Sequence, residues 1–323
     1  MSKKNFTFKR GDYTRGKISQ KRVIQEYSRI AQQLCENPFI PQRCMAQNLS
    51  MSRNTVSKYL REMYAQKVMV GPWMSVNPHE DYKEYVYLMN FTDPFLAYDG
   101  LKEFPHVLYN SLTFGDWNTM VITDRHLDFS KLKGFELKVC WGVKGIVYTP
   151  PVIHATWDQS LKEIYMHLDK FNPLNREPEN LKLDTFLNWG EKEWKLYHAF
   201  KYNVRRNVTP LLKRINVRYE TYSAWIQTVN NHCTFHTEFY PKGYNTYVSL
   251  CLLLDSDYKQ SVKVLFSIFP TTPIVVKVNN QLLVFLKVST SEYRRDTICT
   301  MYDMKAVEMI RGIKKAQTVL EHQ

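Results

Sequence analysis

The sequence repeats a residue pattern in its two halves, and this repeat limits the folds that the chain can adopt. The segment starting at Leu49 reads L-S-M-S-R-N-T-V-S-K-Y-L, and the segment starting at Ile215 reads I-N-V-R-Y-E-T-Y-S-A-W-I. Apolar, threonine and serine positions coincide between the two segments. A second match joins E-Y-V-Y-L-M-N-F-T-D, which ends at Asp93, to T-Y-V-S-L-C-L-L-L-D, which ends at Asp255. The repeat predicts a chain built from one two-domain unit written twice.

The first domain of the first unit is predicted to contain three helices. Apolar residues at helical spacing predict a helix over 22–36 that ends before Asn37-Pro38. A second, shorter helix is predicted over 41–49, with a proline in its first turn. Ser52 is placed to cap a third helix, in which four apolar residues recur at helical spacing. These four residues are Val56, Tyr59, Leu60 and Met63.

A β wing is predicted after the third helix. The short apolar run 68–70 is followed by a turn at Gly71-Pro72 and by a second run over 73–76. Helix, helix, turn, helix and wing together describe a winged helix-turn-helix. The repeat predicts the same order for the second unit.

After each wing the pattern changes to a β-rich order. In the first unit the expected elements, in the order β–α–β–β–α–β, are 82–91, 94–104, 107–114, 117–123, 129–132 and 137–148. In the second unit the first four are 244–254, 258–268, 274–278 and 281–288. Residues 304–320 are expected to form a longer amphipathic helix. The predicted fold class is α+β, a tandem repeat of a winged helix-turn-helix followed by a ferredoxin-like βαββαβ domain.

These patterns predict six segments along the chain. They are a basic flexible arm 1–21, winged helix-turn-helix 1 over 22–78, ferredoxin-like domain 1 over 79–150, a linker 151–187, winged helix-turn-helix 2 over 188–238, and ferredoxin-like domain 2 with a C-terminal helix over 239–323.

The composition favours a polyanionic partner and argues against several protein classes. Among 323 residues, 44 Lys and Arg against 31 Asp and Glu give a net charge of +13, which favours nucleic acid. The chain contains neither the dinucleotide-binding nor the P-loop glycine pattern. No apolar run is long enough to cross a membrane, and the N-terminus carries no signal-peptide core, so a cytoplasmic protein without a membrane partner is expected. The six cysteines form no C-x-x-C pair and are expected to be reduced.

With its apolar residues buried, the third helix would present polar and basic side chains to a DNA major groove. In the first unit the side chains predicted to contact DNA are Ser52, Arg53, Asn54, Thr55, Ser57, Lys58 and Arg61. The candidates in the second unit are Arg205, Arg206, Lys213, Arg214, Arg218 and Tyr219. The third helix of the second unit is less basic, so base reading and a degenerate, scaffolding or phosphate-only role both remain open there.

Two motifs resemble the Lrp/AsnC family of transcriptional regulators. M-A-Q-N-L-S-M-S is similar to that family's L-A-x-x-L-G-L-S helix-turn-helix core, and F-P-H-V with F-G-D-W-N resembles its amino-acid-metabolism regulation domain. The resemblance implies a sequence-specific regulator that binds double-stranded DNA as a covalent pseudo-dimer. It also implies a small-molecule effector such as an amino acid, held near Gly115, Asp116 and Asn118, and a homodimer or higher oligomer formed through the ferredoxin-like domains.

Two other functions fit a basic chain of this kind. One is a tandem winged-helix replication initiator or architectural DNA-binding protein. The other is an enzyme, because some relatives of the fold are siroheme decarboxylases that use His and Arg near the second strand, where this chain has Tyr109 and Asn110.

The sequence contains few histidine patterns that could indicate catalysis or metal binding. His232, Cys233 and His236 could form a metal trio, and His106, or His126 with Asp128, could act in acid–base chemistry. Their sequence neighbourhoods supply no further ligand, nucleophile or orienting partner. We therefore expect no enzymatic activity, no catalytic residue, no metal and no cofactor.

Overall fold

Three helices and a strand open the part of the chain that the computed structural model describes, which is residues 12–173 and 186–322. The elements are α1 (Asp12–Glu36), α2 (Gln42–Asn48), α3 (Arg53–Ala65) and β1 (Met69–Val76). The helices meet around Ile30, Met45, Val56 and Met63, whose exposed fraction is 0%. Apolar spacing on each helix thus builds one small core.

A strand-rich segment follows this group of helices. Its elements are β2 (Tyr85–Phe91), α4 (Pro94–Leu101), β3 (Val107–Gly115), β4 (Thr119–Thr123), the 3₁₀ helix η1 (Phe129–Lys131) and β5 (Phe135–Tyr148). Asp93 caps α4, because its carboxylate accepts hydrogen bonds from the backbone nitrogens of Phe95 and Leu96.

The second half repeats this order after one additional helix, α5 (Trp157–Asp169). Its helical group consists of α6 (Glu191–Phe200), α7 (Val208–Ile215), α8 (Tyr219–Thr228), the 3₁₀ helix η2 (Val229–Asn231) and the strand β6 (Cys233–Phe239). The strand-rich part contains the 3₁₀ helix η3 (Tyr244–Thr246), β7 (Val248–Asp255), α9 (Lys259–Ser267), β8 (Ile274–Val278), β9 (Gln281–Val288), α10 (Ser291–Ala306) and β10 (Gly312–His322). The predicted α+β character is confirmed.

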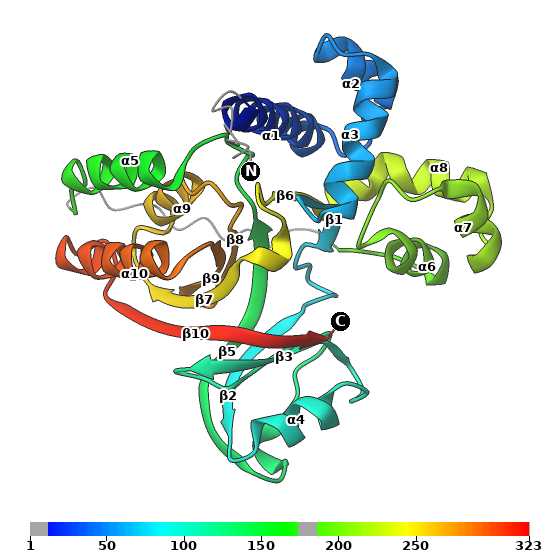
Figure 1. Cartoon of the computed structure of the whole chain (residues 1–323). Helices are drawn as coiled ribbons and strands as arrows, with labels where there is room; N and C mark the ends of the chain where they lie inside the picture. Colours follow the sequence, from blue (N-terminus) through cyan, green and yellow to red (C-terminus); the bar gives the residue numbers. More distant parts are fainter. Residues whose placement is uncertain (1–11, 174–185, 323) are drawn as a thin grey trace, which may run out of the picture.

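The strands of the two halves join into one closed barrel (Figure 1). The order around the barrel is β10-β3-β4-β2-β5-β8-β9-β7, so each half contributes four adjacent strands. Two antiparallel seams connect the halves: Lys144 of β5 pairs with Val278 of β8, and Ala316 of β10 pairs with Gly115 of β3. Closure leaves none of these eight strands as a free edge.

A separate two-stranded sheet joins the helical groups. β1 pairs antiparallel with β6, from Met69 opposite Phe239 to Val76 opposite Cys233. Met74 and Val76 of β1 pack into the core of the second helical group, whereas Phe239 of β6 packs into the core of the first. Each group of helices is therefore completed by a strand from the other half of the chain.

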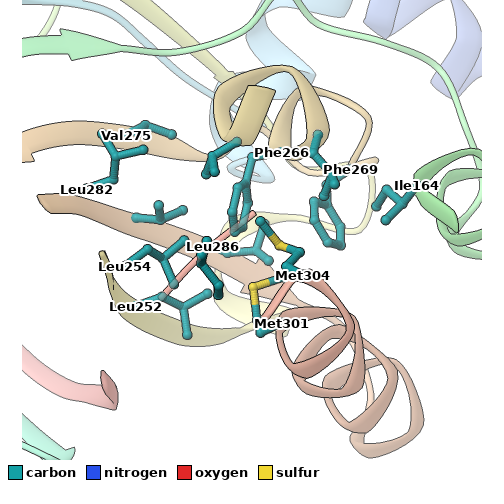
Figure 2. Packing of buried hydrophobic residues seen from close by; sticks show 14 of the residues in the cluster. Ile164, Leu252, Leu254, Phe266, Phe269, Val275, Leu282, Leu286, Met301 and Met304 are labelled. Atoms are coloured by element: carbon teal, nitrogen blue, oxygen red, sulfur yellow. The ribbon is translucent and has the colours of Figure 1, made fainter. Parts of the chain in front are cut away.

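The largest core lies under α5, α9 and α10 (Figure 2). Phe266 of α9, Ile164 of α5 and Met304 of α10 meet above Leu252 and Leu286 of the strands β7 and β9. All five side chains are at most 1% exposed. This core holds the second strand-rich part together.

The predicted wing is wrong in its pairing. Residues 68–76 do not fold into a local hairpin, because β1 continues through Gly71-Pro72 as one strand with a register shift between Val70 and Trp73. Gly71 has φ +89°, and a Cβ there would lie 2.5 Å from the backbone oxygen of His236. The glycine is thus required by the close approach of β6 and not by a tight turn.

The predicted C-terminal helix over 304–320 is also wrong. α10 ends at Ala306, and β10 begins at Gly312 to fill the space between β3 and β7. Ile313 and Ala316 pack into two different cores, and pairing with two distant strands satisfies the backbone groups of β10. Long-range hydrogen bonding overrides a weak helical pattern here.

Two predicted connecting segments also differ from the structure. Residues 1–11 of the expected arm lie outside the described residues, but α1 already begins at Asp12, so the boundary at 21 is wrong. The expected linker 151–187 contains α5, whose Trp157, Ile164 and Leu168 pack into the core of the second half.

Within residues 12–173 and 186–322, no helix is long and apolar enough to cross a membrane.

Candidate nucleic-acid interface

α3 is held against α1 and α2 by its apolar side. Val56, Leu60 and Met63 are buried in the core that α1 supplies with Ile30 and Leu34. The helix begins where the Ser52 hydroxyl accepts a hydrogen bond from the backbone nitrogen of Thr55 at 3.0 Å. A capped helix with a fixed inner side presents its outer side chains in a defined direction.

The outer side of α3 carries the side chains that the sequence predicted. Ser52, Arg53, Asn54, Lys58 and Arg61 are exposed, and Thr55 and Ser57 are partly exposed. Lys58 is 64% exposed and lies 3.9 Å from Glu62, a pair that surface screening makes weak. Glu62 also accepts a hydrogen bond from Tyr27 of α1 at 2.8 Å, which directs this carboxylate toward α1. The remaining outward groups are donors and cations suited to base edges and phosphates.

α2 adds one cation that the sequence reasoning missed. Arg43 lies on the exposed side of α2, in the first turn of that helix. The position of the apolar residues could have indicated this, because Met45 and Ala46 are the buried residues of α2 and leave Arg43 on the outer side of the helix.

The second helical group presents a different surface. Tyr222 and Trp225 of α8 are buried, and Tyr219 is 63% exposed. Lys213 and Arg214 lie in the last turn of α7, and Arg218 occupies the position before α8; all three are exposed. Glu220 adds an exposed acid in the first turn of α8. The cations therefore lie around α8 and not along it.

Arg205 does not belong to this surface, contrary to the sequence prediction. Its guanidinium donates hydrogen bonds to the backbone oxygens of Ile40 at 2.8 Å and Pro38 at 3.2 Å. Burial lowers the pKa of Arg205 from its usual value, and the guanidinium lies beside Tyr64 of α3. The adjacent Arg206 is exposed, with one hydrogen bond to the backbone oxygen of Ala199. Arg205 joins the two helical groups, and Arg206 is left available to a partner.

The junction between the helical groups is also apolar and aromatic. The rings of Phe39 and Phe235 meet edge to face with centroids 5.2 Å apart. The Trp73 indole nitrogen donates to Glu238 at 2.6 Å, and its ring lies 4.2 Å from that of His236. Contacts on both sides of the β1–β6 sheet thus fix how α3 and α8 are placed relative to one another.

His236 is buried in this junction as a neutral ring. Its Nε2 lies 3.1 Å from the Ser75 hydroxyl and 3.0 Å from the Thr234 hydroxyl, and its Nδ1 lies 3.1 Å from the Thr149 hydroxyl. Burial, followed by the nearby Lys144 charge, lowers the pKa of His236 to about 3. Because hydroxyls occupy both ring nitrogens, His236 does not combine with His232 and Cys233 as a metal trio. Over the residues that the structure describes, no three His, Cys, Asp or Glu side chains are arranged to hold a metal ion.

The other histidines considered for catalysis lie on the surface of the first strand-rich part. His106 Nδ1 lies 3.0 Å from a carboxylate oxygen of Asp124. The His126 ring meets that of Trp141 at 4.8 Å, whereas Asp128 caps η1 by accepting from Ser130. The structure does not bring His126 and Asp128 together as an acid–base pair.

The residues predicted to hold an effector lie where strands meet, Gly115 and Asp116 beside β10 and Asn118 beside β2. Gly115 has φ +148°, and a Cβ there would lie 2.2 Å from the backbone oxygen of Lys315. The Asp116 carboxylate accepts from the backbone nitrogen of Lys315 at 2.6 Å. The Asn118 amide donates to the Phe91 backbone oxygen at 2.8 Å and accepts from the Phe91 nitrogen at 3.0 Å. These contacts join neighbouring strands, and the Asp116 side chain remains exposed.

A cluster of titratable side chains from β6, β9 and the C-terminal end of β10 was not predicted. Glu238 accepts hydrogen bonds from Trp73 and Tyr240, and burial raises its pKa. Lys287 lies 3.6 Å from the centroid of the Tyr244 ring, and burial lowers its pKa. Glu321 accepts from Tyr244 at 3.1 Å. The cluster combines separate strands and loops, and no local motif in the sequence marks it.

Tyr109 and Asn110, which occupy the positions of the siroheme-decarboxylase motif, make different contacts. The Tyr109 hydroxyl donates to Glu321 at 3.5 Å and so joins the edge of this cluster, and burial raises its pKa. Asn110 points away from it and donates to the Tyr98 backbone oxygen at 2.8 Å.

Comparison with known proteins gave structural neighbours but no relative by sequence. No protein-family model matches the chain, and no curated protein matches it. The structure is similar to the crystal structure of the siroheme decarboxylase NirDL, with a TM-score of 0.42 and 11% sequence identity over 92% of this chain and 91% of that chain. For NirDL in co-complex with an iron-uroporphyrin III analogue, the TM-score is 0.40 and the identity 9%, over 87% and 86% of the two chains.

These neighbours contradict the expectation that the chain is not an enzyme, because both are structures of an enzyme. At these TM-scores and identities the likeness assigns no activity, substrate or family to this chain.

Proposed function

We propose that this protein binds double-stranded DNA and regulates transcription. In this proposal α1–α3, completed by β6, and α6–α8, completed by β1, act as two helix-turn-helix units that share the β1–β6 sheet, here called head 1 and head 2. Each head precedes a ferredoxin-like unit, and the two halves form a covalent pseudo-dimer with the Lrp/AsnC-like organisation implied by the sequence motifs. The single observation that carries the proposal is the outer side of α3, where Arg53, Asn54, Lys58 and Arg61 are exposed together on a capped helix.

Three features support the choice of duplex DNA. An α-helix fits the B-form major groove, where Arg, Lys and Asn side chains recognise bases directly. The net charge of +13 supplies the electrostatic attraction that duplex binding requires. Head 2 contributes further cations at Lys213, Arg214 and Arg218. The two heads are also fixed relative to one another, which favours a common partner for both over an outer side that only contacts solvent.

A mobility-shift titration of the full chain with duplex DNA tests the proposal. We expect Arg53→Ala and Lys58→Ala each to weaken binding by about 5- to 10-fold, in line with the loss of one charge-assisted contact. Lys162→Ala is the matched control, because Lys162 is an exposed cation on α5. Equal affinities for all three variants and the unmodified chain would contradict the proposal.

A map of bound genomic sites separates the related DNA-binding functions. A regulator would occupy promoter sites, a replication initiator would occupy clustered repeats, and an architectural protein would cover DNA almost continuously. We propose the regulator, and clustered or continuous occupancy would contradict that choice while leaving duplex binding intact.

An enzymatic role is the second candidate, and the buried Glu238 and Lys287 favour it. Burial raises the pKa of Glu238 and lowers the pKa of Lys287, and buried groups with shifted pKa values gather at sites that move protons. The test is the absorption spectrum of the purified chain after addition of a siroheme-type tetrapyrrole. A spectral shift that Lys287→Met abolishes would support this role, and an unchanged spectrum would contradict it.

A further inference from the structure

The two heads offer different chemistry to a DNA duplex. In head 1 the first turn of α3 contains Arg53 and Asn54 and no acid, and Lys58 and Arg61 extend the same surface along the helix. Arginine, lysine and asparagine are the side chains that form the most specific contacts with base edges in the major groove. Head 1 therefore has the groups needed to distinguish one sequence from another.

Head 2 lacks these groups along its corresponding helix. The sequence of α8, Y-E-T-Y-S-A-W-I-Q-T, contains no Lys or Arg, and Glu220 lies exposed in its first turn. The cations of head 2 are at the end of α7, at Lys213 and Arg214, and before α8, at Arg218. In a helix-turn-helix the helix before the recognition helix crosses the phosphate backbone. Cations in these positions can neutralise phosphates without reading bases.

The heads cannot move apart to serve two independent sites. β1 completes the core of head 2, and β6 completes the core of head 1. Arg205 donates to the Ile40 backbone oxygen at 2.8 Å, and Trp73 donates to Glu238 at 2.6 Å, so hydrogen bonds cross the junction on two sides. Figure 1 shows α3 and α8 on the same side of the molecule, away from α10. This junction sets one spacing between the surfaces that the two heads present.

We propose that the DNA target of this protein is asymmetric. It consists of one half-site whose bases are read by α3, and a second half, at a fixed distance, whose phosphates are held by Lys213, Arg214 and Arg218 with little preference for sequence. This inference rests on the proposed duplex binding and adds to it. A symmetric dimer reads an inverted repeat because both heads are identical, whereas this chain has two different heads in one polypeptide.

The asymmetry makes distinct predictions for each half of the target. Changing a base pair read by α3 should weaken binding by about 5- to 150-fold, the usual range for a mismatch in a specific site. Changing a base pair in the other half should alter affinity by less than about 2-fold, because phosphate contacts carry no sequence information directly. Removing the DNA of the second half altogether should weaken binding strongly, since its phosphates are lost.

Selection of duplexes from a random library by the full chain tests the proposal. We expect the selected sequences to share one conserved half-site, flanked on one side by a stretch of required length and variable sequence. Two conserved half-sites related by inversion would overturn the asymmetric target while leaving the proposed function in place. Failure to select any sequence, together with absent binding to mixed duplex, would instead remove the proposed function.

Variants then assign each half to its head. Arg53→Ala should reduce the sequence preference of the conserved half-site. Lys213→Ala combined with Arg214→Ala should weaken binding about equally for all duplexes that contain the site, without changing which bases are preferred. A change of base preference in the second variant would contradict the phosphate-only role of head 2. Circular dichroism of both variants checks that the exposed substitutions leave the fold intact.

Discussion

The Trp73 indole nitrogen lies 2.6 Å from the Glu238 carboxylate and donates a hydrogen bond to it across the β1–β6 sheet. Trp73 belongs to the first half of the chain and Glu238 to the second. Glu238 is only 5% exposed, so its carboxylate depends on such donors in place of water. One buried contact thereby ties the position of α3 to that of α8.

Loss of this donor should destabilise the whole chain. We expect Trp73→Phe to lower the free energy of unfolding by about 1–3 kcal/mol, because a buried acceptor loses a partner. Trp141→Phe is the control, since Trp141 is 39% exposed on β5. Urea unfolding followed by circular dichroism measures both. Equal stability of the two variants would show that the Trp73 contact does not support the junction.

Arg205 and Arg206 are adjacent in sequence but should differ in effect. Arg205→Met removes the donor to two backbone oxygens at the junction and should cost about 1–3 kcal/mol of unfolding free energy. Arg206→Met changes an exposed residue and should stay within about 0.5 kcal/mol of the unmodified chain. DNA binding should show the opposite order of effects. Arg206→Met should reduce the salt dependence of duplex affinity directly, whereas Arg205→Met should not. The reverse pattern in stability would refute the assignment of Arg205 to the junction.

Gly115 allows the close approach of β3 and β10. Gly115→Ala would place a Cβ 2.2 Å from the Lys315 backbone oxygen at φ +148°, so we expect a loss of about 1–3 kcal/mol. Gly100→Ala provides a control of opposite sign: Gly100 is exposed in α4 with nothing within 4 Å of the added Cβ, and alanine there should stabilise by about 0.5–1 kcal/mol. Thermal unfolding distinguishes the two. A Gly115→Ala variant as stable as the unmodified chain would contradict the described seam.

His236 should make stability depend on pH. Its pKa in the folded chain is about 3, far below the value near 6.5 that is usual in an unfolded chain. As the pH falls below about 6.5, the unfolded histidine binds a proton that the folded one does not, so the unfolding free energy decreases by up to about 1.4 kcal/mol per pH unit until about pH 3. His236→Gln should remove the contribution of this one histidine to the pH dependence of stability, and His154→Gln, at an exposed position, is the control. Identical pH dependence in both variants would contradict a buried neutral His236.

Local patterns in the sequence were sufficient for elements whose partners are nearby. The strands 274–278 and 281–288 were predicted with their observed bounds, and the Ser52 cap of α3 is confirmed. Helical spacing of Val56, Leu60 and Met63 was also enough to expose Arg53 and Lys58 on the opposite side.

Features created by distant contacts could not be predicted in this way. The sequence of β1 alone is typical of a hairpin, but its partner is the distant strand β6. The sequence of β10 alone has a helical pattern, but the segment pairs with β3 and β7. Arg205 looks like any basic residue of a helical surface, but the backbone oxygens that it contacts are more than 160 residues away. In each case, the deciding interaction joins the two halves of the chain, and one half alone gives no sign of it.

The salt dependence of duplex binding tests the central claim that α3 meets the DNA. The double variant Arg53→Ala/Lys58→Ala should bind at least about 10-fold more weakly and lower the slope of log affinity against log salt by up to about 1.8, the upper limit for the loss of two cations at the duplex surface. The control Lys162→Ala/Lys305→Ala loses the same charge from exposed positions on α5 and α10. We expect an unchanged slope for the control pair. Equal changes in both pairs would mean that net charge alone attracts the DNA, and would contradict a direct contact between α3 and the duplex.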